Sequence, residues 1–187
     1  MGKIIREMLK EKAVILSETD IQRVLKRISH EIIEKNRGSK NIVFLGIHKR
    51  GVPLAERIAK NISALEGAEV FSGKLDITFY RDDLAKRAKP KVEITEIPFA
   101  IDDRDIILVD DVLFTGRTIR SAMNAIMDFG RPKTIQLVVL VDRGHRQLPV
   151  RADYVGKNIP TSLNEFIEVN LAETDGRDRV VILEDME

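Results

Sequence analysis

The sequence predicts an α/β fold in which helices flank both faces of a mostly parallel central sheet. Three apolar runs have the length and composition of strands buried on both faces, namely Ile42–Ile47, Ile106–Val109 and Thr134–Val141. Segments with helical spacing of apolar residues alternate with these runs, as a parallel sheet requires. A chain of 187 residues can bury a full core, so we expect residues 1–187 to form a single domain.

The composition narrows the classes of function. The chain has no cysteine, which excludes disulfides, thiol catalysis and thiolate metal sites, and its three histidines lack metal-ligand spacing. A net charge of +1 argues against a protein that coats nucleic acid, although charge can still gather on one face. No stretch is apolar over the length of a membrane span, so we expect a cytoplasmic protein with no membrane partner.

The N-terminal part predicts a short strand and a long helix. Residues 1–12 are polar and basic and should be loosely ordered, whereas Ala13–Leu16 should form an edge strand. Ser17 and Thr19 are candidate caps for a helix that ends near Asn36. The side opposite its apolar stripe carries Arg23, Lys26, Arg27, His30 and Lys35. Spacing alone favours a solvated helix face there.

A basic turn follows the strand Ile42–Ile47. It contains Lys49, Arg50 and Gly51, and a helix over residues 53–62 begins at a proline. The carboxyl ends of parallel strands form the ligand-binding edge of α/β sheets, so these cations are candidates for binding an anion. The alternative is that two exposed loop cations only increase solubility.

The segment between two predicted half-exposed strands is a candidate lid. Gly73–Tyr80 alternates apolar and polar residues, and Val92–Phe99 alternates more loosely and could pair with it. Residues 81–91 between them are polar, contain a proline and carry five cations against two acids. We expect a flexible cationic hairpin that closes over an anionic substrate and excludes water. The alternative is a charged surface hairpin.

The central buried strand is followed by two acids, Asp110 and Asp111. A short loop with Thr115, Gly116 and Thr118 comes next, and a helical pattern follows it. Unpaired N–H groups and the dipole at a helix start favour an anion such as phosphate, and glycine lets the backbone approach it. Carboxylates at this position suit ribose hydroxyls or a cation beside them. Alternatively, such acids and threonines only cap the helix.

Short elements complete the chain. Tyr154–Thr161 predicts a short strand and turn, and Phe166–Leu171 and Val180–Leu183 predict the last two strands. Together with the N-terminal segment, residues from about 150 to 187 should form a small hood over the carboxyl edge of the sheet.

Residues 106–120, IILVDDVLFTGRTIR, resemble the motif with which type I phosphoribosyltransferases bind phosphoribosyl pyrophosphate (PRPP). That motif consists of an apolar strand, two acids and then T-G-x-T. GIHKRGVPLA, DITFYRDDL and VDRGHRQLPVRADYVGKNIPTS are similar to a bifunctional branch of this family, which attenuates a pyrimidine operon and has uracil phosphoribosyltransferase activity. The resemblance covers the chain from Lys12 to Thr161, with Phe114 where a tyrosine is more usual.

This resemblance implies a type I phosphoribosyltransferase fold and the conversion of uracil and PRPP to UMP and pyrophosphate, with Mg²⁺ as cofactor. It implies that Asp110, Asp111 and Arg81 are catalytic, and that Mg²⁺ arrives with PRPP near the two acids without a dedicated protein site. Residues 115–118 would hold the 5′-phosphate, and uracil would be contacted largely by backbone groups. The implied PRPP and UMP site comprises Lys49, Arg50, Asp110, Asp111, Val112, Leu113, Phe114, Thr115, Gly116, Arg117, Thr118, Arg143, Val155 and Ile159.

The resemblance also implies binding of pyrimidine operon leader mRNA when UMP or UTP occupies the nucleotide site. The implied RNA-binding residues are Lys26, Arg27, His30, Lys35, Arg146, Arg151 and Lys157. A homo-oligomer, dimeric or larger, is implied as well. The sequence contains no general RNA-recognition signature such as an RNP motif. Two alternatives stay open, a plain salvage phosphoribosyltransferase without RNA regulation and a regulator that has lost useful catalysis.

Overall fold

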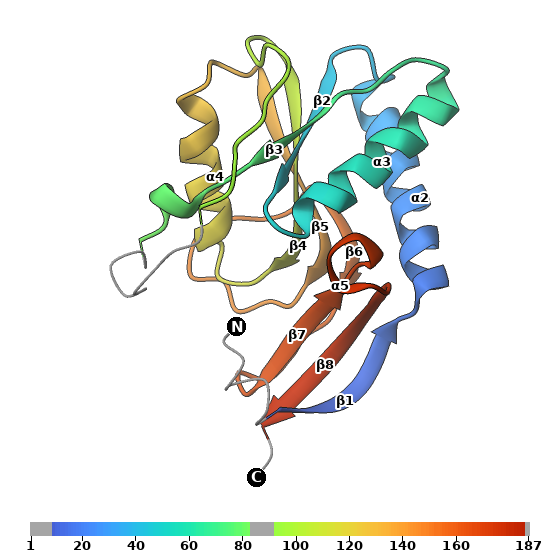
Figure 1. Cartoon of the computed structure of the whole chain (residues 1–187), viewed down its shortest axis with the longest axis vertical. Helices are drawn as coiled ribbons and strands as arrows, with labels where there is room; N and C mark the ends of the chain where they lie inside the picture. Colours follow the sequence, from blue (N-terminus) through green and yellow to red (C-terminus); the bar gives the residue numbers. More distant parts are fainter. Residues whose placement is uncertain (1–8, 83–91, 186–187) are drawn as a thin grey trace.

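The structure is a computed structural model that describes residues 9–82 and 92–185. A five-stranded parallel sheet with the strand order β3-β2-β4-β5-β6 forms its centre (Figure 1). Its strands are β2 (Ile42–Ile47), β3 (Ser72–Leu75), β4 (Asp105–Leu113), β5 (Thr134–Asp142) and β6 (Tyr154–Asn158). The predicted parallel α/β sheet is therefore confirmed.

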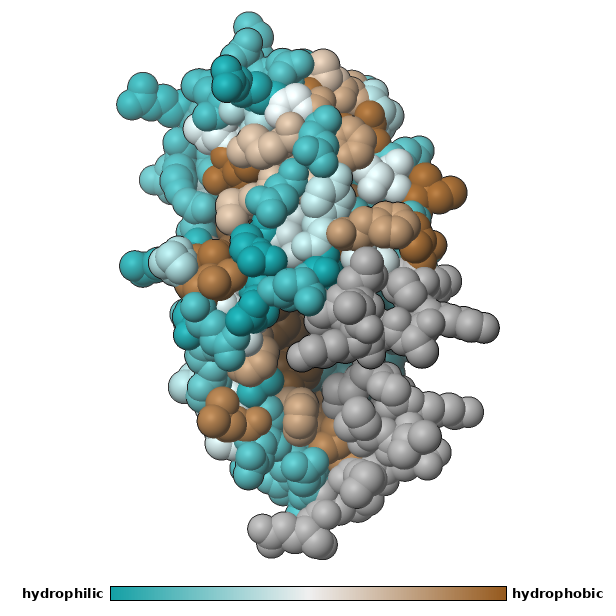
Figure 2. All heavy atoms as spheres, turned by 90° about the vertical axis from the view of Figure 1, so that its left-hand side faces the viewer, coloured by the Kyte–Doolittle hydropathy of each residue, from teal (hydrophilic) through white to brown (hydrophobic). Residues whose placement is uncertain are grey.

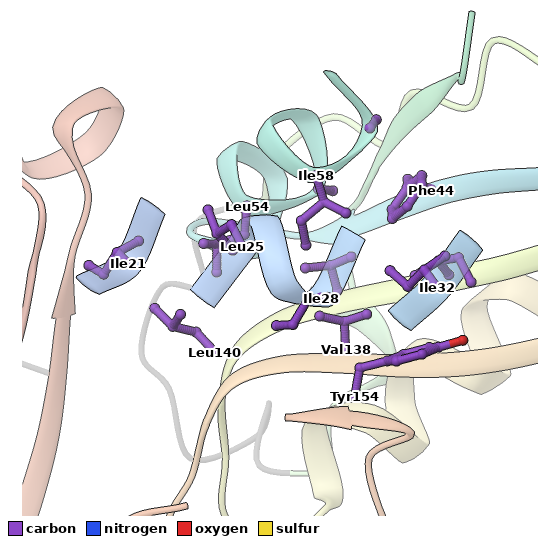
Figure 3. Packing of buried hydrophobic residues seen from close by; sticks show 14 of the residues in the cluster. Ile21, Leu25, Ile28, Ile32, Phe44, Leu54, Ile58, Val138, Leu140 and Tyr154 are labelled. Atoms are coloured by element: carbon purple, nitrogen blue, oxygen red, sulfur yellow. The ribbon is translucent and has the colours of Figure 1, made fainter. Parts of the chain in front are cut away.

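Helices cover both faces of this sheet, as predicted (Figure 1). The helices are α2 (Glu18–Asn36), α3 (Gly51–Glu66) and α4 (Arg117–Met127). Alternate residues of the buried strands face opposite layers, so that Ile107 of β4 packs with α2 and α3 whereas Ile106 packs with α4. Figure 3 shows Ile28 of α2 and Ile58 of α3 packed together near Val138 of β5. The surface on the α4 side is mostly hydrophilic, with apolar side chains in small separate groups (Figure 2).

A second, antiparallel sheet has the order β1-β8-β7. Its elements are β1 (Leu9–Leu16), β7 (Glu165–Asn170) and β8 (Arg179–Asp185), and the short helix α5 (Ala172–Asp175) joins β7 to β8. β1 begins earlier than predicted because β8 supplies backbone partners to its polar residues, with Lys10 opposite Glu184. β6, which we expected in the hood, instead pairs with β5 as the edge of the central sheet.

The predicted strand Gly73–Tyr80 is wrong beyond Leu75. The Asp76 carboxylate accepts a hydrogen bond from the backbone N–H of Thr78 at 2.9 Å and turns the chain into a 3₁₀ turn, η1 (Thr78–Tyr80). Within the described residues, Val92–Phe99 forms one isolated bridge to β3 rather than a paired strand. Most of the predicted lid, residues 83–91, lies outside the described residues. None of the described helices is long and apolar enough to cross a membrane.

Candidate active site

β4 carries both acids to the carboxyl edge of the sheet. The prediction that the strand ends at Val109 is wrong, because the pairing of β4 with β5 continues through both acids to Leu113. Asp110 is 7% exposed, and its carboxylate accepts the N–H of Asp111 at 2.9 Å. Neighbouring side chains on a strand point to opposite faces, so Asp111 lies on the side of α3, where its carboxylate is 3.9 Å from Arg50. Asp110 lies on the side of α4, within the electrostatic influence of Arg81.

The electrostatics of this pair favour a cationic or hydrogen-bonding ligand. Burial raises the pKa of Asp110 well above its usual range, and the negative charge of Asp111 adds to this effect. Burial also raises the pKa of Asp111, although the positive charge of Arg50 opposes the shift. A divalent cation or donated hydroxyl groups would therefore stabilise the ionised acids.

A cavity of about 230 Å³ lies over the loop between β4 and α4. Gly116 is the N-cap residue directly before α4 and has a φ of 90°, a left-handed conformation that favours glycine. The carbonyl of Thr115 accepts the N–H groups of Gln147 and Leu148 at 3.0 and 3.1 Å, which fix the loop. The cavity is lined by Arg81, Asp82, Ser121 and every residue from Val112 to Ile119. The structure thus brings the predicted phosphate loop together around one cavity at a helix start.

A second cavity, of about 320 Å³, adjoins Asp111 and contains the predicted cations Lys49 and Arg50. Its remaining walls come from β7 and from α5, at Thr174 and Asp175. The Nε and Nη2 atoms of Arg50 each donate to the Asp175 carboxylate at 2.9 Å. Two cavities therefore lie beside the end of β4, and the second contains the acids Asp111, Glu168 and Asp175 as well as its two cations.

Two arginines after β5 brace the phosphate loop. The buried Arg143 donates to Thr161 Oγ1 at 3.0 Å and stacks 4.2 Å from the Phe114 ring centroid, and burial lowers its pKa. Arg146, predicted on the RNA surface, donates to the Phe114 carbonyl at 2.7 Å and forms an ion pair with Asp142. Arg146 therefore lies against the phosphate loop, and its guanidinium already binds protein groups. An RNA contact would require an exposed guanidinium.

The predicted uracil contacts lie at and beyond β6. Ile159 is buried, and its N–H donates to the carbonyl of Asp142 at 2.8 Å. Val155 is half-buried beside residues that pack under α4, and its carbonyl accepts a hydrogen bond from Arg27 at 2.9 Å. Ile159 is therefore attached to the end of β5, and the two arginines that follow β5 contact the phosphate loop.

The predicted RNA-binding cations of α2 divide into two groups. Arg27 and Lys35 face β6, where Arg27 binds backbone carbonyls and Lys35 pairs with Asp153 at 2.6 Å. Lys26 and His30 are exposed, as Arg27 and Lys35 also are. Arg151 and Lys157 are exposed too, on the segment that leads into β6 and on β6 itself.

Asp175 is a site residue that sequence reasoning missed. It belongs to a helix of four residues, too short for a hydrophobic period, and it lies 125 residues from Arg50 along the chain. The one signal was a cluster of acids at 173, 175 and 178, which resembles a solvated loop. Among residues 9–82 and 92–185, no group of three or more His, Cys, Asp or Glu residues could hold a metal ion.

The comparison with known families identifies the chain as a phosphoribosyltransferase. Residues 15–175 match the family described as Phosphoribosyl transferase domain. A hypoxanthine phosphoribosyltransferase from Trypanosoma cruzi shares the fold with a TM-score of 0.72 and 20% identity, over 92% of this chain and 95% of that one. One from Staphylococcus aureus gives a TM-score of 0.66 and 21% identity, over 100% and 98% of the two chains.

Within this class, the chain belongs to the family of proteins named bifunctional protein PyrR. It is 57% identical to the relative from Deinococcus radiodurans over 178 residues, which covers 95% of this chain and 97% of the relative. It is 59% identical to the relative from Pelotomaculum thermopropionicum over 181 residues, which covers 96% and 100%. Both functions implied by the resemblance thus agree with the family.

Proposed function

We propose that the chain transfers the phosphoribosyl group of PRPP to uracil, which yields UMP and pyrophosphate, and that it binds pyrimidine operon leader RNA in response to UMP or UTP. One observation carries the enzymatic part. Asp111 lines the cavity of Lys49 and Arg50, and the next residue, Val112, lines the cavity of the phosphate loop. A sugar placed over these residues would have its 5′-phosphate in one cavity and its pyrophosphate in the other.

The residues at the end of β4 suit Mg²⁺ carried by PRPP. Carboxylate oxygens are hard ligands that Mg²⁺ prefers, and burial makes the ionised forms of Asp110 and Asp111 unfavourable unless a nearby cation stabilises them. Asp110 and Asp111 would hold the ribose hydroxyls, and the ion would arrive with PRPP near these acids rather than at a dedicated protein site. When bound, Mg²⁺ neutralises the charge that develops on the leaving pyrophosphate.

The chain's own residues supply orientation and charge. Cleavage of the bond between ribose C1 and pyrophosphate builds negative charge on the leaving group, which Lys49 and Arg50 would stabilise from the same cavity. Arg81 lines the cavity of the phosphate loop and would add its positive charge from that side. Backbone groups near Val155 and Ile159 would hold uracil in line with the ribose. Arg143 would contribute indirectly, because its hydrogen bond to Thr161 and its stacking on Phe114 fix the surrounding segments. Two expectations stay predictions, namely that residues 81–91 close over the substrate and that residues 1–187 form a single domain.

The enzymatic proposal is tested by measuring product formation with uracil, hypoxanthine, adenine and orotate. We expect UMP from uracil and little product from the other bases. The double variant Asp110→Asn with Asp111→Asn should keep the fold and lose turnover. A preference for a purine would overturn the base assignment, and near-normal turnover of the double variant would contradict the role of the acids.

The regulatory proposal is supported by the family and by the exposed cations of α2 and of the segment around β6. Lys26→Glu combined with His30→Glu should weaken leader RNA binding and reduce its salt dependence, because phosphate contacts release counterions. Lys133→Glu is the control, since Lys133 is an exposed cation outside the predicted RNA surface, just before the start of β5. Recovery of a pyrimidine leader from cellular RNA only with UMP would support regulation. Equal recovery without UMP would contradict control by the nucleotide, and no recovery of the leader would favour a plain salvage enzyme. We further propose that the protein is cytoplasmic and that it forms a homo-oligomer. Analytical ultracentrifugation would test the oligomeric state.

A further inference from the structure

The connection between β7 and β8 places a carboxylate against a cation of the proposed pyrophosphate cavity. Asp175 accepts hydrogen bonds from Nε and Nη2 of Arg50, both at 2.9 Å, in a bidentate pair. The pairing raises the pKa of Arg50 and lowers that of Asp175 far below its usual range, so both groups stay charged at neutral pH. The side chains are 30% and 22% exposed, so the pair is partly shielded from solvent.

We propose that Asp175 is a positioning residue that orients Arg50 for the pyrophosphate group, an inference that rests on the proposed function. A guanidinium is planar and has five N–H donors. Asp175 binds the edge formed by Nε and Nη2, which leaves Nη1 directed toward Asp111 at 3.9 Å. A flexible side chain is thereby fixed in one plane before the substrate binds, which lowers the entropic cost of binding.

Asp175 is itself held in place. Its carboxylate accepts the N–H of Leu171 at 3.1 Å and the hydroxyl of Thr174 at 2.7 Å. The surrounding segment has a separate anchor, because Arg57 of α3 pairs with Glu173 and Asp178 at 2.7 and 2.5 Å. Substitution of Asp175 would therefore release Arg50 while the segment stays attached to α3.

The competing interpretation is that Asp175 occupies the pyrophosphate position and inhibits binding. The geometry favours positioning, because the carboxylate uses two donors of Arg50 and leaves Nη1 on the side of Asp111. Lys49 also lines the same cavity, so a pyrophosphate group would meet two cations. The two interpretations predict opposite changes in affinity, which makes them separable.

The test is calorimetric titration with magnesium pyrophosphate, together with KM values for PRPP and for uracil. Asp175→Asn keeps the shape of the side chain and removes its charge, and Asp175→Glu keeps the charge. We expect Asp175→Asn to weaken pyrophosphate binding and raise the KM for PRPP about tenfold, as a misplaced ligand-binding group does. The KM for uracil should not change, and Asp175→Glu should restore part of the affinity.

Glu173→Gln is the matched control, since it removes an acid of the same helix that pairs with Arg57 instead of Arg50. It should leave pyrophosphate affinity unchanged, and thermal unfolding would confirm that each variant folds. Unchanged or tighter binding by Asp175→Asn would overturn the positioning role, as would an equal loss in Glu173→Gln. A wild-type chain that binds pyrophosphate but forms no UMP would contradict the proposed reaction alone, and the titration would still decide the role of Asp175.

Discussion

The first turn of α3 packs so closely against β4 that Gly51→Ala should disturb both stability and substrate binding. A Cβ at Gly51 would lie 2.3 Å from the carbonyl oxygen of Val109, and its other near neighbours are also backbone atoms of β4. An ordinary contact requires a separation about 1 Å larger, so the helix start must move. Overpacking of this kind lowers the free energy of unfolding by about 1–3 kcal/mol. The loss should lie at the upper end of this range, because backbone atoms move less easily than side chains. Reduced freedom of the unfolded chain offsets roughly 0.5 kcal/mol, which leaves a net loss of about 2–3 kcal/mol.

For a chain of this length, that loss corresponds to a fall of roughly 5–10 °C in Tm, which thermal unfolding would measure. Because Arg50 directly precedes Gly51, the KM for PRPP should rise as well. Gly67→Ala is the control, since Gly67 caps the other end of α3 and a Cβ there meets no atom within 4 Å. Its φ of 66° makes Gly67→Ala cost about 1 kcal/mol without a change in KM. A Tm and KM near wild type for Gly51→Ala would refute the packing argument.

Three further substitutions separate electrostatic from structural roles. Asp110→Asn should raise Tm at neutral pH, because the raised pKa of Asp110 makes its ionised form unfavourable in the folded state. This gain should shrink as the pH falls and disappear well below about pH 4, where the acid is protonated in both states. Arg57→Met should cost about 2–4 kcal/mol in urea unfolding, since it leaves the buried Asp178 unpaired. The lowered pKa of Asp178 means that this loss should shrink as the pH falls. Arg143→Met should cost about 2 kcal/mol and accelerate hydrogen exchange near Thr161, which loses its guanidinium partner; unchanged exchange would contradict its bracing role.

The sequence was sufficient for the features that depend on local pattern. The central strands are continuous apolar runs and the helices have a clear 3.6-residue period, so both layers of the fold could be predicted. The phosphate loop was predictable for the same reason, since the strand, Gly116 and the helix start are neighbours along the chain. The ends of the strands were predicted less accurately, because contacts with other segments determine where a strand ends. β4 extends through the acids because β5 pairs with it, and the strand after Gly73 ends early because Asp76 captures the backbone of Thr78.

The contacts that determine the role of each cation depend on topology instead. Arg146 and Lys26 look equally basic in the sequence, yet one binds a carbonyl of the phosphate loop and the other is exposed on α2. Arg50 was predictable as an anion-binding residue, whereas its partner Asp175 arrives through the β7–α5–β8 connection. That connection is held near α3 by pairing of β8 with β1 and by the ion pairs of Arg57. Hydrophobic periodicity cannot predict these ion pairs, because the residues that form them are polar and lie more than a hundred positions apart.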